Sequence, residues 1–384
     1  MKESNILIVL PSISIKWWIE KSATTIWNEL SMKWYNVFYL TTYKSLKLKH
    51  HIFWKEIAIN FIKSTNVLVK IFSLLYIWYY IKKYSSLYNI NTSISFWDNW
   101  NFYNTISKIL WNKSKIIISI RTSINESVPR LNKVLLKYLY PKADFVVPIV
   151  KEERQNLIQN YWIKPKKIQS IYNMFDIKWI QKKSEENLWE YQYLFNNGKF
   201  TFINIWRLSK QKNQKLLLKA FDKFHQRNIN TQLLILWDGE LKDELKIQKQ
   251  SLSSNKDIHF LWVHENPYKF LANSDIYVSS SSYEWMSRVL IEAMACWLPI
   301  VTTDHPTWAK EIIKKDIQDF RMVKRVSKEE YGILVPVDNQ RYLTEAMQDL
   351  YNNKGLQRHY SQKSKKRAKE FNIDNLISDW EMIL

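Results

Sequence analysis

Short apolar runs alternate with helix-length segments along the chain, and this alternation constrains the fold more than any other feature. Continuous apolar runs separated by helices are typical of buried parallel strands whose sheet is covered on both faces. We expect strands at 5–10, 36–41, 92–96, 115–120, 144–149 and 168–172, and then at 200–205, 232–236, 258–261, 275–279 and 299–303. We expect helices at 19–33, 66–84, 102–111, 129–140 and 150–160, and then at 212–226, 240–248, 286–296, 340–352 and 355–371.

The strand–helix rhythm falls into two sets, separated by the polar stretch 175–198, which lacks strand character. The chain has 384 residues, and a domain takes about 100–200. We therefore predict an α/β protein with two doubly wound, Rossmann-like domains, at 1–175 and 196–370. The last segment, 372–384, is an amphipathic helix with no strand after it.

Glycine and tryptophan have unusual frequencies: the chain contains 4 glycines and 19 tryptophans. Glycine usually makes up about 7% of a chain, and an α/β protein needs it at turns and helix ends with positive φ. The single cysteine, Cys296, excludes a disulfide framework and suits a reducing cytoplasm. It is interpreted as a small buried apolar residue.

The net charge of +21 lies mostly in the first half, where residues 1–180 carry 26 Lys and Arg against 10 Asp and Glu, or +16. Such a charge favours anionic partners: nucleic acid, anionic lipid or phosphorylated substrates. The alternative is codon bias, since Lys, Asn and Ile are abundant, as is typical of AT-rich genes.

The aromatic segment 66–83 ends in lysines and has two interpretations, a core helix of the first domain or a helix in a membrane interface. Lys70 interrupts it, so a spanning helix is not predicted.

The segment 281–294, SSYEWMSRVLIEAM, joins a strand end to a helix with two carboxylates. Glu292 stands eight positions after Glu284, which is about 12 Å along a helix. Two carboxylates at that distance can lie on either side of a folded nucleotide sugar. The free N–H groups of 286–289 would form an anion site at the helix N-terminus. The alternative is one capping and one surface glutamate.

Two cations follow another strand end, at Arg207 and Lys212. Arginine offers a planar fork to phosphate oxygens and lysine a point charge. Such a pair can neutralise a diphosphate leaving group as its negative charge grows. Surface cations are also common in a basic protein.

Taken together and in order, these pieces resemble the family-4 retaining glycosyltransferases of the GT-B fold (glycosyl transferases group 1). The resemblance is dense from 200 to 340 and thinner before it. Its pieces are Trp17-Trp18-Ile19-Glu20, the Arg207/Lys212 pair, Trp237-Asp238-Gly239-Glu240, Phe260-Leu261-Trp262-Val263, Glu284 and Glu292 as an E-x7-E pattern, Asp304-His305-Pro306-Thr307-Trp308, and Gly332-Ile333-Leu334-Val335-Pro336.

The resemblance implies two domains facing a cleft, with the last helix crossing back to the first domain. It also implies transfer of a sugar from a nucleoside diphosphate sugar, most often UDP-linked, with retention and without a metal or cofactor. Glu284, Arg207 and Lys212 are the expected catalytic residues: the cations stabilise the diphosphate and Glu284 orients the sugar. The expected substrate contacts are Glu292 on the ribose, Val263 at the base, Trp206, Trp285, Met286, Ser287, Arg288 and Val289 around the phosphates, Trp17 and Trp18 closing over them, and Arg121 on the acceptor or sugar.

The chain departs from the family in one direction, because tryptophan stands where the family has glycine. These positions are 17, 18, 206, 237, 262, 285, 297 and 308, and Trp34 and Trp162 occupy similar turns. We interpret them as UGA codons that mean glycine in the host and were read as tryptophan. Their backbones should then have positive φ and their rings should be pushed out. Trp380 should pack as a true tryptophan, and Trp54 and Trp78, in expected helical contexts, are also read as genuine.

The acceptor implied is a glycan or lipid-linked intermediate of envelope polysaccharide synthesis, and no nucleic acid is expected as a partner. The location implied is cytoplasmic, peripheral at the inner face of the membrane. Two alternatives remain: a non-catalytic GT-B protein that binds anionic polymer, or another GT-B enzyme such as a UDP-sugar epimerase or a sugar phosphorylase.

Overall fold

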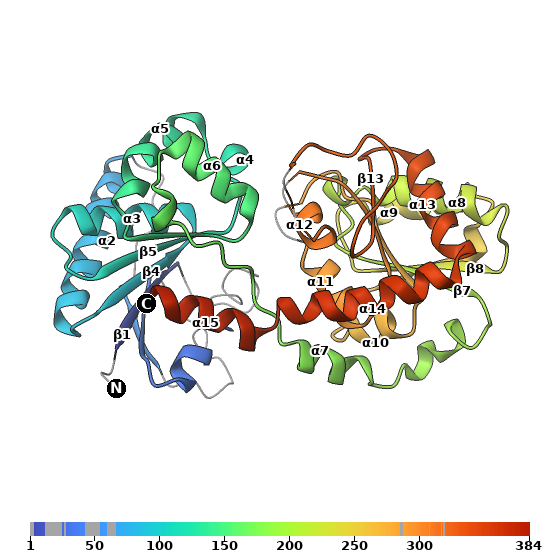
Figure 1. The fold of residues 1–384 in the computed structure, drawn as a ribbon, viewed down its shortest axis with the longest axis horizontal. Helices are drawn as coiled ribbons and strands as arrows, with labels where there is room; N and C mark the ends of the chain where they lie inside the picture. The colour runs from blue at the N-terminus through green and yellow to red at the C-terminus, as the bar shows by residue number, and fades with distance from the viewer. Residues whose placement is uncertain are drawn as a thin grey trace. The chain divides into compact units, whose positions relative to one another are not determined.

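The computed structural model describes residues 4–11, 25–26, 28–42, 54–59, 67–284, 287–306, 308–315, 317 and 319–384. The chain divides into two compact units (Figure 1). Unit 1 comprises residues 1–174 and 373–384, and unit 2 comprises residues 175–372. The two crossings between them lie side by side, because Phe175 and Asn372 form a β-bridge within unit 2.

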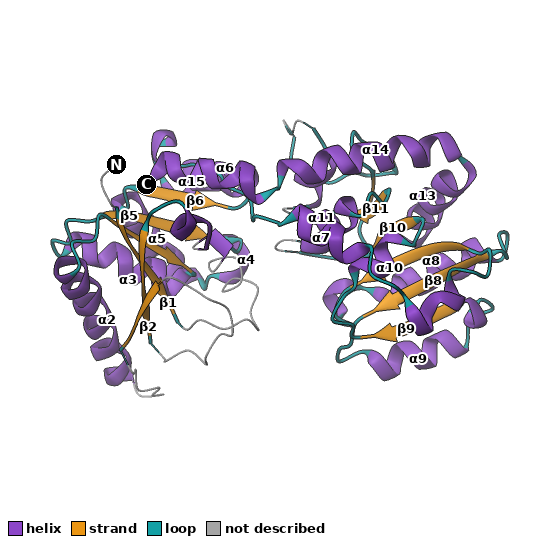
Figure 2. Ribbon diagram, turned by 90° about the horizontal axis from the view of Figure 1, so that it is seen from below, coloured by secondary structure: helices purple, strands orange, loops and turns teal. Residues whose placement is uncertain are grey.

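Unit 1 contains a six-stranded parallel sheet in the order β3-β2-β1-β4-β5-β6. Figure 2 shows strands of this sheet in orange, with β1, β2, β5 and β6 labelled. Its strands are β1 (Asn5–Leu10), β2 (Asn36–Thr41), β3 (Trp54–Ala58), β4 (Thr92–Phe96), β5 (Lys115–Ile120) and β6 (Phe145–Pro148). Its helices are α2 (Val67–Leu87), α3 (Asp98–Ile109), α4 (Ile124–Ser127), α5 (Arg130–Leu139), α6 (Lys151–Tyr161) and α15 (Ile373–Ile383), with 3-10 turns η1 (Tyr140–Lys142) and η2 (Pro165–Lys167). The order reverses between β1 and β4, which makes this a doubly wound sheet.

Helices cover both faces of this sheet, because alternate residues of each strand point to opposite sides. In β1, Ile8 packs in a cluster with Trp380 of α15, whereas Val9 packs in a cluster with Ile81 of α2. Trp380 is fully buried, and its ring lies 6.1 Å from that of Phe96. The expectation that Trp380 packs as an apolar anchor is confirmed.

Helix α2 is a core helix along its second half, because Ile77 and Ile81 are buried against the sheet. Its outer side exposes Tyr76 and Tyr79, which are 41% and 49% accessible. In the described chain, no helix is both long enough and apolar enough to cross a membrane.

Unit 2 contains a seven-stranded sheet in the order β12-β13-β11-β10-β7-β8-β9, parallel except for β12. Its strands are β7 (Phe200–Ile205), β8 (Thr231–Leu236), β9 (Ile258–Trp262), β10 (Ile276–Ser279), β11 (Ile300–Thr303), β12 (Ser327–Lys328) and β13 (Ile333–Val335). Its α-helices are α7 (Ile177–Ser184), α8 (Gln214–His225), α9 (Lys242–Gln250), α10 (Tyr268–Ala272), α11 (Arg288–Ala295), α12 (Ala309–Ile313), α13 (Gln340–Asn352) and α14 (Lys354–Glu370). Its 3-10 turns are η3 (Trp189–Leu194), η4 (Lys210–Lys212) and η5 (Asn255–Asp257). Two doubly wound sheets confirm the predicted fold class.

Some elements differ from the sequence-based expectation. The run 168–172 forms no strand and keeps one bridge, Val146 to Ile168. Strands β3, β12 and β13 were not expected, and Trp54 begins β3, so its expected helical context is wrong. The expected linker 175–198 contains α7 and η3.

Tryptophan dominates the left-handed backbone positions. In the part of the chain that the structure describes, eleven residues other than glycine have a positive φ, and eight of them are tryptophans. They are Trp34, Trp97, Trp111, Trp162, Trp189, Trp237, Trp262 and Trp297, with φ between 48° and 118°. A side chain with a Cβ crowds the backbone there, whereas glycine adopts positive φ freely. Five of these positions were expected, and 97, 111 and 189 were not.

Four of these tryptophans stand where a helix ends, and one of them, Trp162, is the left-handed C-cap of α6. After Trp34, Trp111 and Trp297, the next backbone N–H donates to the carbonyl five residues before it, as in Tyr35 N to Leu30 O. This is the bond of a Schellman motif, whose left-handed residue is usually glycine. Seven of the eight rings are 39% to 82% exposed, as in Trp189 at 75%, and only Trp262 is less exposed.

The glycine interpretation does not describe every position that was named for it. Trp17, Trp18 and Trp285 lie outside the described residues. Trp308 has a φ of −103° and is fully buried, so the expectation that its ring is pushed outward is wrong. Its ring packs 6.3 Å from that of Phe371, which shows that the unit 2 core has room for it. Trp206 is outside the positive-φ group as well.

Alanine usually gives a more stable protein than glycine. Backbone strain at these left-handed positions predicts the reverse order of the free energies of unfolding. At Trp34 and Trp189, glycine should give a free energy of unfolding about 1 kcal/mol above that of alanine, because only glycine removes the Cβ. At Trp179, which is 44% exposed inside α7, alanine should be better by a similar amount. Urea unfolding of the six variants measures this. The same order at all three positions would contradict the interpretation.

Candidate functional site

The candidate site lies at the carboxyl edge of the unit 2 sheet. Strand β7 pairs with β8 on one side and β10 on the other, so the strand order reverses between β7 and β10. Ligands of open α/β sheets bind outside the strand ends at such a switch point. Lys212 follows β7 and Glu284 follows β10.

Hydrogen bonds join the turns that follow β7 and β10. The hydroxyl of Ser280 donates to the carbonyls of Lys212 and Asn213, at 3.0 Å each. The N–H of Ser282 donates to the carbonyl of Gln211 at 2.9 Å. Asn213, itself at a φ of 48°, caps α8 by accepting from the N–H of Leu216. The start of α8 is thereby fixed beside the turn that carries Glu284.

Lys212 and Glu284 form a buried ion pair between Nζ and Oε2. Their residues are 6% and 4% exposed, and the hydroxyl of Ser281 donates to Glu284 Oε1 at 2.8 Å. Burial lowers the pKa of Lys212, and Glu284 opposes that shift by favouring the ammonium. The structure thus brings together the cation and the carboxylate that the sequence placed 72 residues apart.

The indole of Trp206 covers Lys212. The ammonium Nζ lies 3.5 Å from the centre of the ring, and the indole Nε1 donates to the Ser287 hydroxyl at 3.4 Å. A cation over an indole face is stabilised by the ring quadrupole. The ring therefore occupies one approach to the ammonium.

Arg207 lies at the surface beside the pair. It forms an ion pair with Glu240 at 3.0 Å, with side chains 67% and 51% exposed, and such pairs contribute little. Gly239 allows the turn after β8 to pack here, because a Cβ on it would lie 2.3 Å from the carbonyl oxygen of Leu208. Arg207 is thus placed by the packing of two turns but remains free to reorient.

The helix after Glu284 carries the second predicted carboxylate. Helix α11 begins at Arg288, with Ser287 as its N-cap, and Val289 is 6% exposed. The Arg288 Nε lies 3.9 Å from Glu292 Oε1, with side chains 19% and 13% exposed. Trp285 and Met286 lie outside the described residues.

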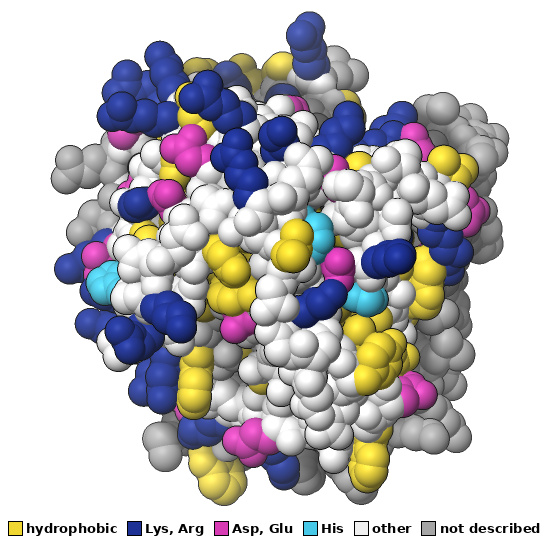
Figure 3. Space-filling view, turned by 90° about the vertical axis from the view of Figure 1, so that its right-hand side faces the viewer, with side chains coloured by type: hydrophobic (Ala, Val, Ile, Leu, Met, Phe, Trp, Pro, Cys, Tyr) yellow, Lys and Arg dark blue, Asp and Glu magenta, His cyan; other side chains and the backbone are white. Residues whose placement is uncertain are grey.

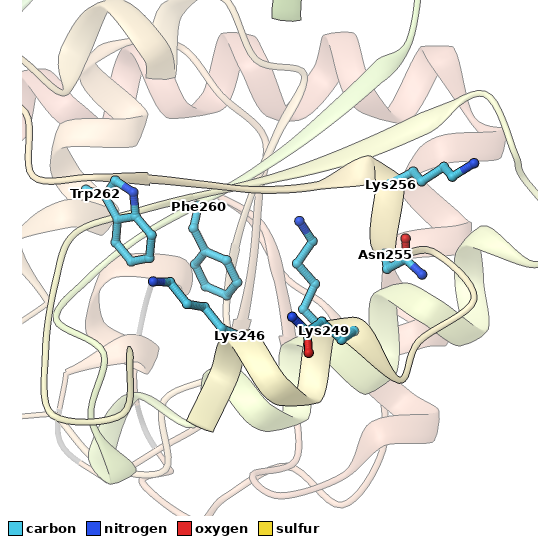
Figure 4. Close-up of a pocket in the computed structure, with 7 residues that line it drawn as sticks. Lys246, Lys249, Asn255, Lys256, Phe260 and Trp262 are labelled. Carbon is cyan, nitrogen blue, oxygen red and sulfur yellow. The ribbon is translucent and has the colours of Figure 1, made fainter. Parts of the chain in front are cut away.

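Val263 lies just past the end of β9 and is 57% exposed. Next to it, a cavity of about 560 Å³ opens between α9 and β9, lined by Lys246, Lys249, Gln250, Asn255, Lys256, Phe260 and Trp262 (Figure 4). Lys246 points toward the stacked rings of Phe260 and Trp262. Trp262, which forms one wall of the cavity, has a left-handed backbone conformation. None of the predicted site residues lines the cavity, so we assign it no role.

His305 belongs to the site and was missed as a functional residue. It stands two residues after the end of β11, is fully buried, and its Nε2 has no hydrogen-bond partner. Burial lowers its pKa most, with Glu284 opposing and Lys212 adding to that shift, so the imidazole is a neighbour of the ion pair. Its imidazole gives no charge signal in the sequence, and only the order of the sheet places the end of β11 next to the end of β10.

The remaining predicted residues belong to unit 1. Arg121 follows β5 and is 2% exposed. Trp17 and Trp18 are in a part of the chain that the structure does not describe. Cys296, in unit 2, is partly buried rather than fully buried as predicted, and this burial raises the pKa of its thiol to about 12. No group of three His, Cys, Asp or Glu side chains suited to a metal ion occurs in the described chain.

Comparison with known proteins identifies the class. The fold is that of GT-B glycosyltransferases: a glycosyltransferase from Rickettsia africae matches with a TM-score of 0.78 and 15% identity, covering 100% of this chain and 98% of the other. Anabaena Alr3699/HepE, solved in complex with UDP, matches with the same TM-score and identity, covering 98% of each chain.

The sequence comparisons identify the family. "Glycosyl transferases group 1" matches residues 185–367. The Campylobacter jejuni N-acetylgalactosamine-N,N'-diacetylbacillosaminyl-diphospho-undecaprenol 4-alpha-N-acetylgalactosaminyltransferase is 30% identical over 334 residues, which are 84% of this chain and 85% of that protein. This chain belongs to the group 1 glycosyltransferases, and the predicted family is confirmed.

The buried pair predicts unequal costs for two similar substitutions. Lys212→Met leaves the Glu284 carboxylate buried without its cation and should cost about 3–5 kcal/mol of unfolding free energy. Lys215→Met breaks an exposed pair with Glu244 on the neighbouring helix and should cost less than about 1 kcal/mol. Adding Glu284→Gln to Lys212→Met should recover most of the loss. Denaturant unfolding measures all three variants, and equal costs for the two lysines would refute the pair's role.

Proposed function

We propose that this glycosyltransferase moves a hexose-type sugar from a nucleoside diphosphate sugar, UDP-linked, to a glycan or lipid-linked acceptor of envelope polysaccharide synthesis, with retention. The observation that carries the proposal is the buried Lys212–Glu284 pair at the switch point of unit 2. A protein that only binds anionic polymer has no use for a carboxylate buried against its anion-binding cation.

The cations match the chemistry of the leaving group. When the bond from the sugar to the diphosphate breaks, negative charge grows on the diphosphate, and a fixed cation stabilises that change. Lys212 is held by its contacts, whereas Arg207 only has to leave a solvent-exposed pair. These two charges are of the kind that a divalent ion would supply, so we propose a metal-independent reaction with no cofactor.

The carboxylates match the neutral parts of the donor. Glu284 keeps one oxygen on Ser281 and one on Lys212, and a donor phosphate competing for Lys212 would free the second oxygen for a sugar hydroxyl. Glu292 lies further along α11, and we assign it to the ribose hydroxyls, with Val263 at the base. The covering ring of Trp206 would hinder this donor, as expected if glycine stands there natively.

The acceptor is proposed to be linked to a lipid diphosphate. The support is the Campylobacter jejuni relative, whose name describes a diphospho-undecaprenol acceptor. Both nucleotide sugars and such lipids meet at the cytoplasmic face of a membrane. The outer side of α2, with Tyr76, Tyr79 and Lys83, offers aromatic rings and a cation of the kind that suits a headgroup layer.

A donor screen tests the enzymatic proposal. Release of nucleoside diphosphate should depend on a UDP-sugar and an acceptor lipid. The protein with glycine at positions 17, 18, 206, 237, 262, 285 and 297 should be the more active, with the buried Trp308 kept. Lys212→Ala should lower kcat/KM by about 10²–10³. Lys215→Ala, its exposed neighbour, should leave it within about twofold. If none of the donors tried gives release of nucleoside diphosphate, or if both lysine variants lose activity equally, the non-catalytic alternative is favoured.

Vesicle sedimentation tests the membrane proposal. The protein should bind vesicles containing anionic lipid in preference to neutral ones, and binding should weaken as salt rises, because surface charges are screened beyond about 8 Å at physiological ionic strength. We place the contact on unit 1, because residues 1–180 carry +16 of the net charge of +21. The face shown in Figure 3 carries Lys and Arg together with Asp and Glu. Tyr79→Ser should weaken binding more than Tyr193→Ser, an exposed tyrosine of unit 2. No preference for anionic lipid would leave codon bias as the source of the charge.

A further inference from the structure

Unit 1 buries an arginine at the carboxyl edge of its sheet. Arg121 follows β5, next to the end of β4, and its guanidinium carbon lies 4.8 Å from the centre of the Phe96 ring. The residue is 2% exposed. The strand order of unit 1 reverses between β1 and β4, so this arginine stands one strand from the switch point.

Only one of the three guanidinium nitrogens of Arg121 has a hydrogen-bond partner. Nη1 donates to Oδ1 of Asn173, and both Nε and Nη2 are buried without a hydrogen-bond partner. By covalent geometry, the N–H groups of Nε and Nη2 lie along the same edge of the planar group. That edge is the two-pronged fork that binds carboxylate and phosphate oxygens in parallel.

The charge is also uncompensated. Burial alone accounts for the lowering of the pKa of Arg121, to about 9, and no carboxylate of the described chain forms an ion pair with it. A buried cation without an anionic partner destabilises a fold, and apolar substitutes of similar size are usually better for stability. The unpaired Nε and Nη2 of Arg121 are suited to binding an oxyanion. Keeping them unpaired in the interior lowers the stability of the fold.

We propose that Arg121 binds a phosphate oxyanion of a substrate through Nε and Nη2, as an anion site of unit 1. Two substrates carry this chemistry, the nucleoside diphosphate donor and a diphosphate-linked acceptor, and this assignment of sources rests on the function proposed above. Unit 2 already has two cations for the donor. We therefore assign the phosphate at Arg121 to the acceptor.

Anion binding is tested without the enzymatic reaction. Arg121→Met should raise the unfolding temperature in plain buffer by a few degrees, because it removes an unpaired buried charge. It should also lose the stabilisation that inorganic pyrophosphate gives to unit 1. The pyrophosphate shift is measured in the Arg207→Met/Lys212→Met/Glu284→Gln background, which lacks both cations that unit 2 offers to a diphosphate. Arg130→Met, at an exposed arginine of the same unit, should change neither quantity.

The two results separate a binding role from a structural one. If Arg121→Met lowers the unfolding temperature in plain buffer, or keeps the full pyrophosphate shift, the proposal is overturned. This holds whether or not a sugar donor has been found, so a failed donor screen does not decide it.

Steady-state kinetics then identifies the source of the phosphate. Arg121→Met should raise KM for the lipid-linked acceptor about 10–100-fold, with KM for the donor unchanged, and Arg121→Lys should restore part of the loss. A rise in the donor KM alone would assign the site to the donor instead. Unchanged KM values for both substrates would overturn the proposal.

Discussion

The buried ion pair between Lys212 and Glu284 organises unit 2. Each partner stands at the end of a different strand, and neither charge is tolerable in the interior without the other. The pair therefore fixes the turns after β7 and β10 in one arrangement, with Ser280 and Ser282 adding hydrogen bonds between them. Because these turns border the switch point, the pair holds a cation and a carboxylate at the edge of the sheet where ligands of open α/β sheets usually bind.

Left-handed turns impose the second constraint. Doubly wound domains return from each helix to the next strand through tight helix ends, and these need positive φ. In this chain, tryptophan occupies most such positions that the structure describes, and its rings mostly point to solvent. The backbone has kept the conformation that glycine permits, although the side chains do not suit it. Trp308 and Trp380 differ, since both are buried within ordinary cores.

Much of the fold could be predicted from periodicity, and the misses have physical causes. Strand β1 and strand β7 are apolar runs bounded by polar residues, so their positions were clear. Strand β3 contains Lys55 and Glu56, and β12 has two residues, so neither shows an apolar run. The apolar run 168–172 was mistaken for a strand because its side chains fill the unit 1 core from a loop, as Ile171 does.

The candidate site was predictable where charged residues end a strand, as at Lys212 and Glu284. His305 escaped because an imidazole beside a proline gives no charge signal, and only the sheet order brings β11 next to β10. The free fork of Arg121 could not be predicted at all, since burial of that side chain comes from long-range packing. In the proposed function, the Lys212 ammonium is the centre of the donor site.

Calorimetric titration with UDP tests that claim most directly. Trp206→Gly uncovers the ammonium and should bind UDP at least about tenfold more tightly than the parent chain, because the ring no longer occupies the approach to Lys212. Adding Lys212→Met and Glu284→Gln to Trp206→Gly should abolish the gain. If uncovering the lysine leaves UDP binding unchanged, or if the gain persists without it, the donor site is not centred on Lys212.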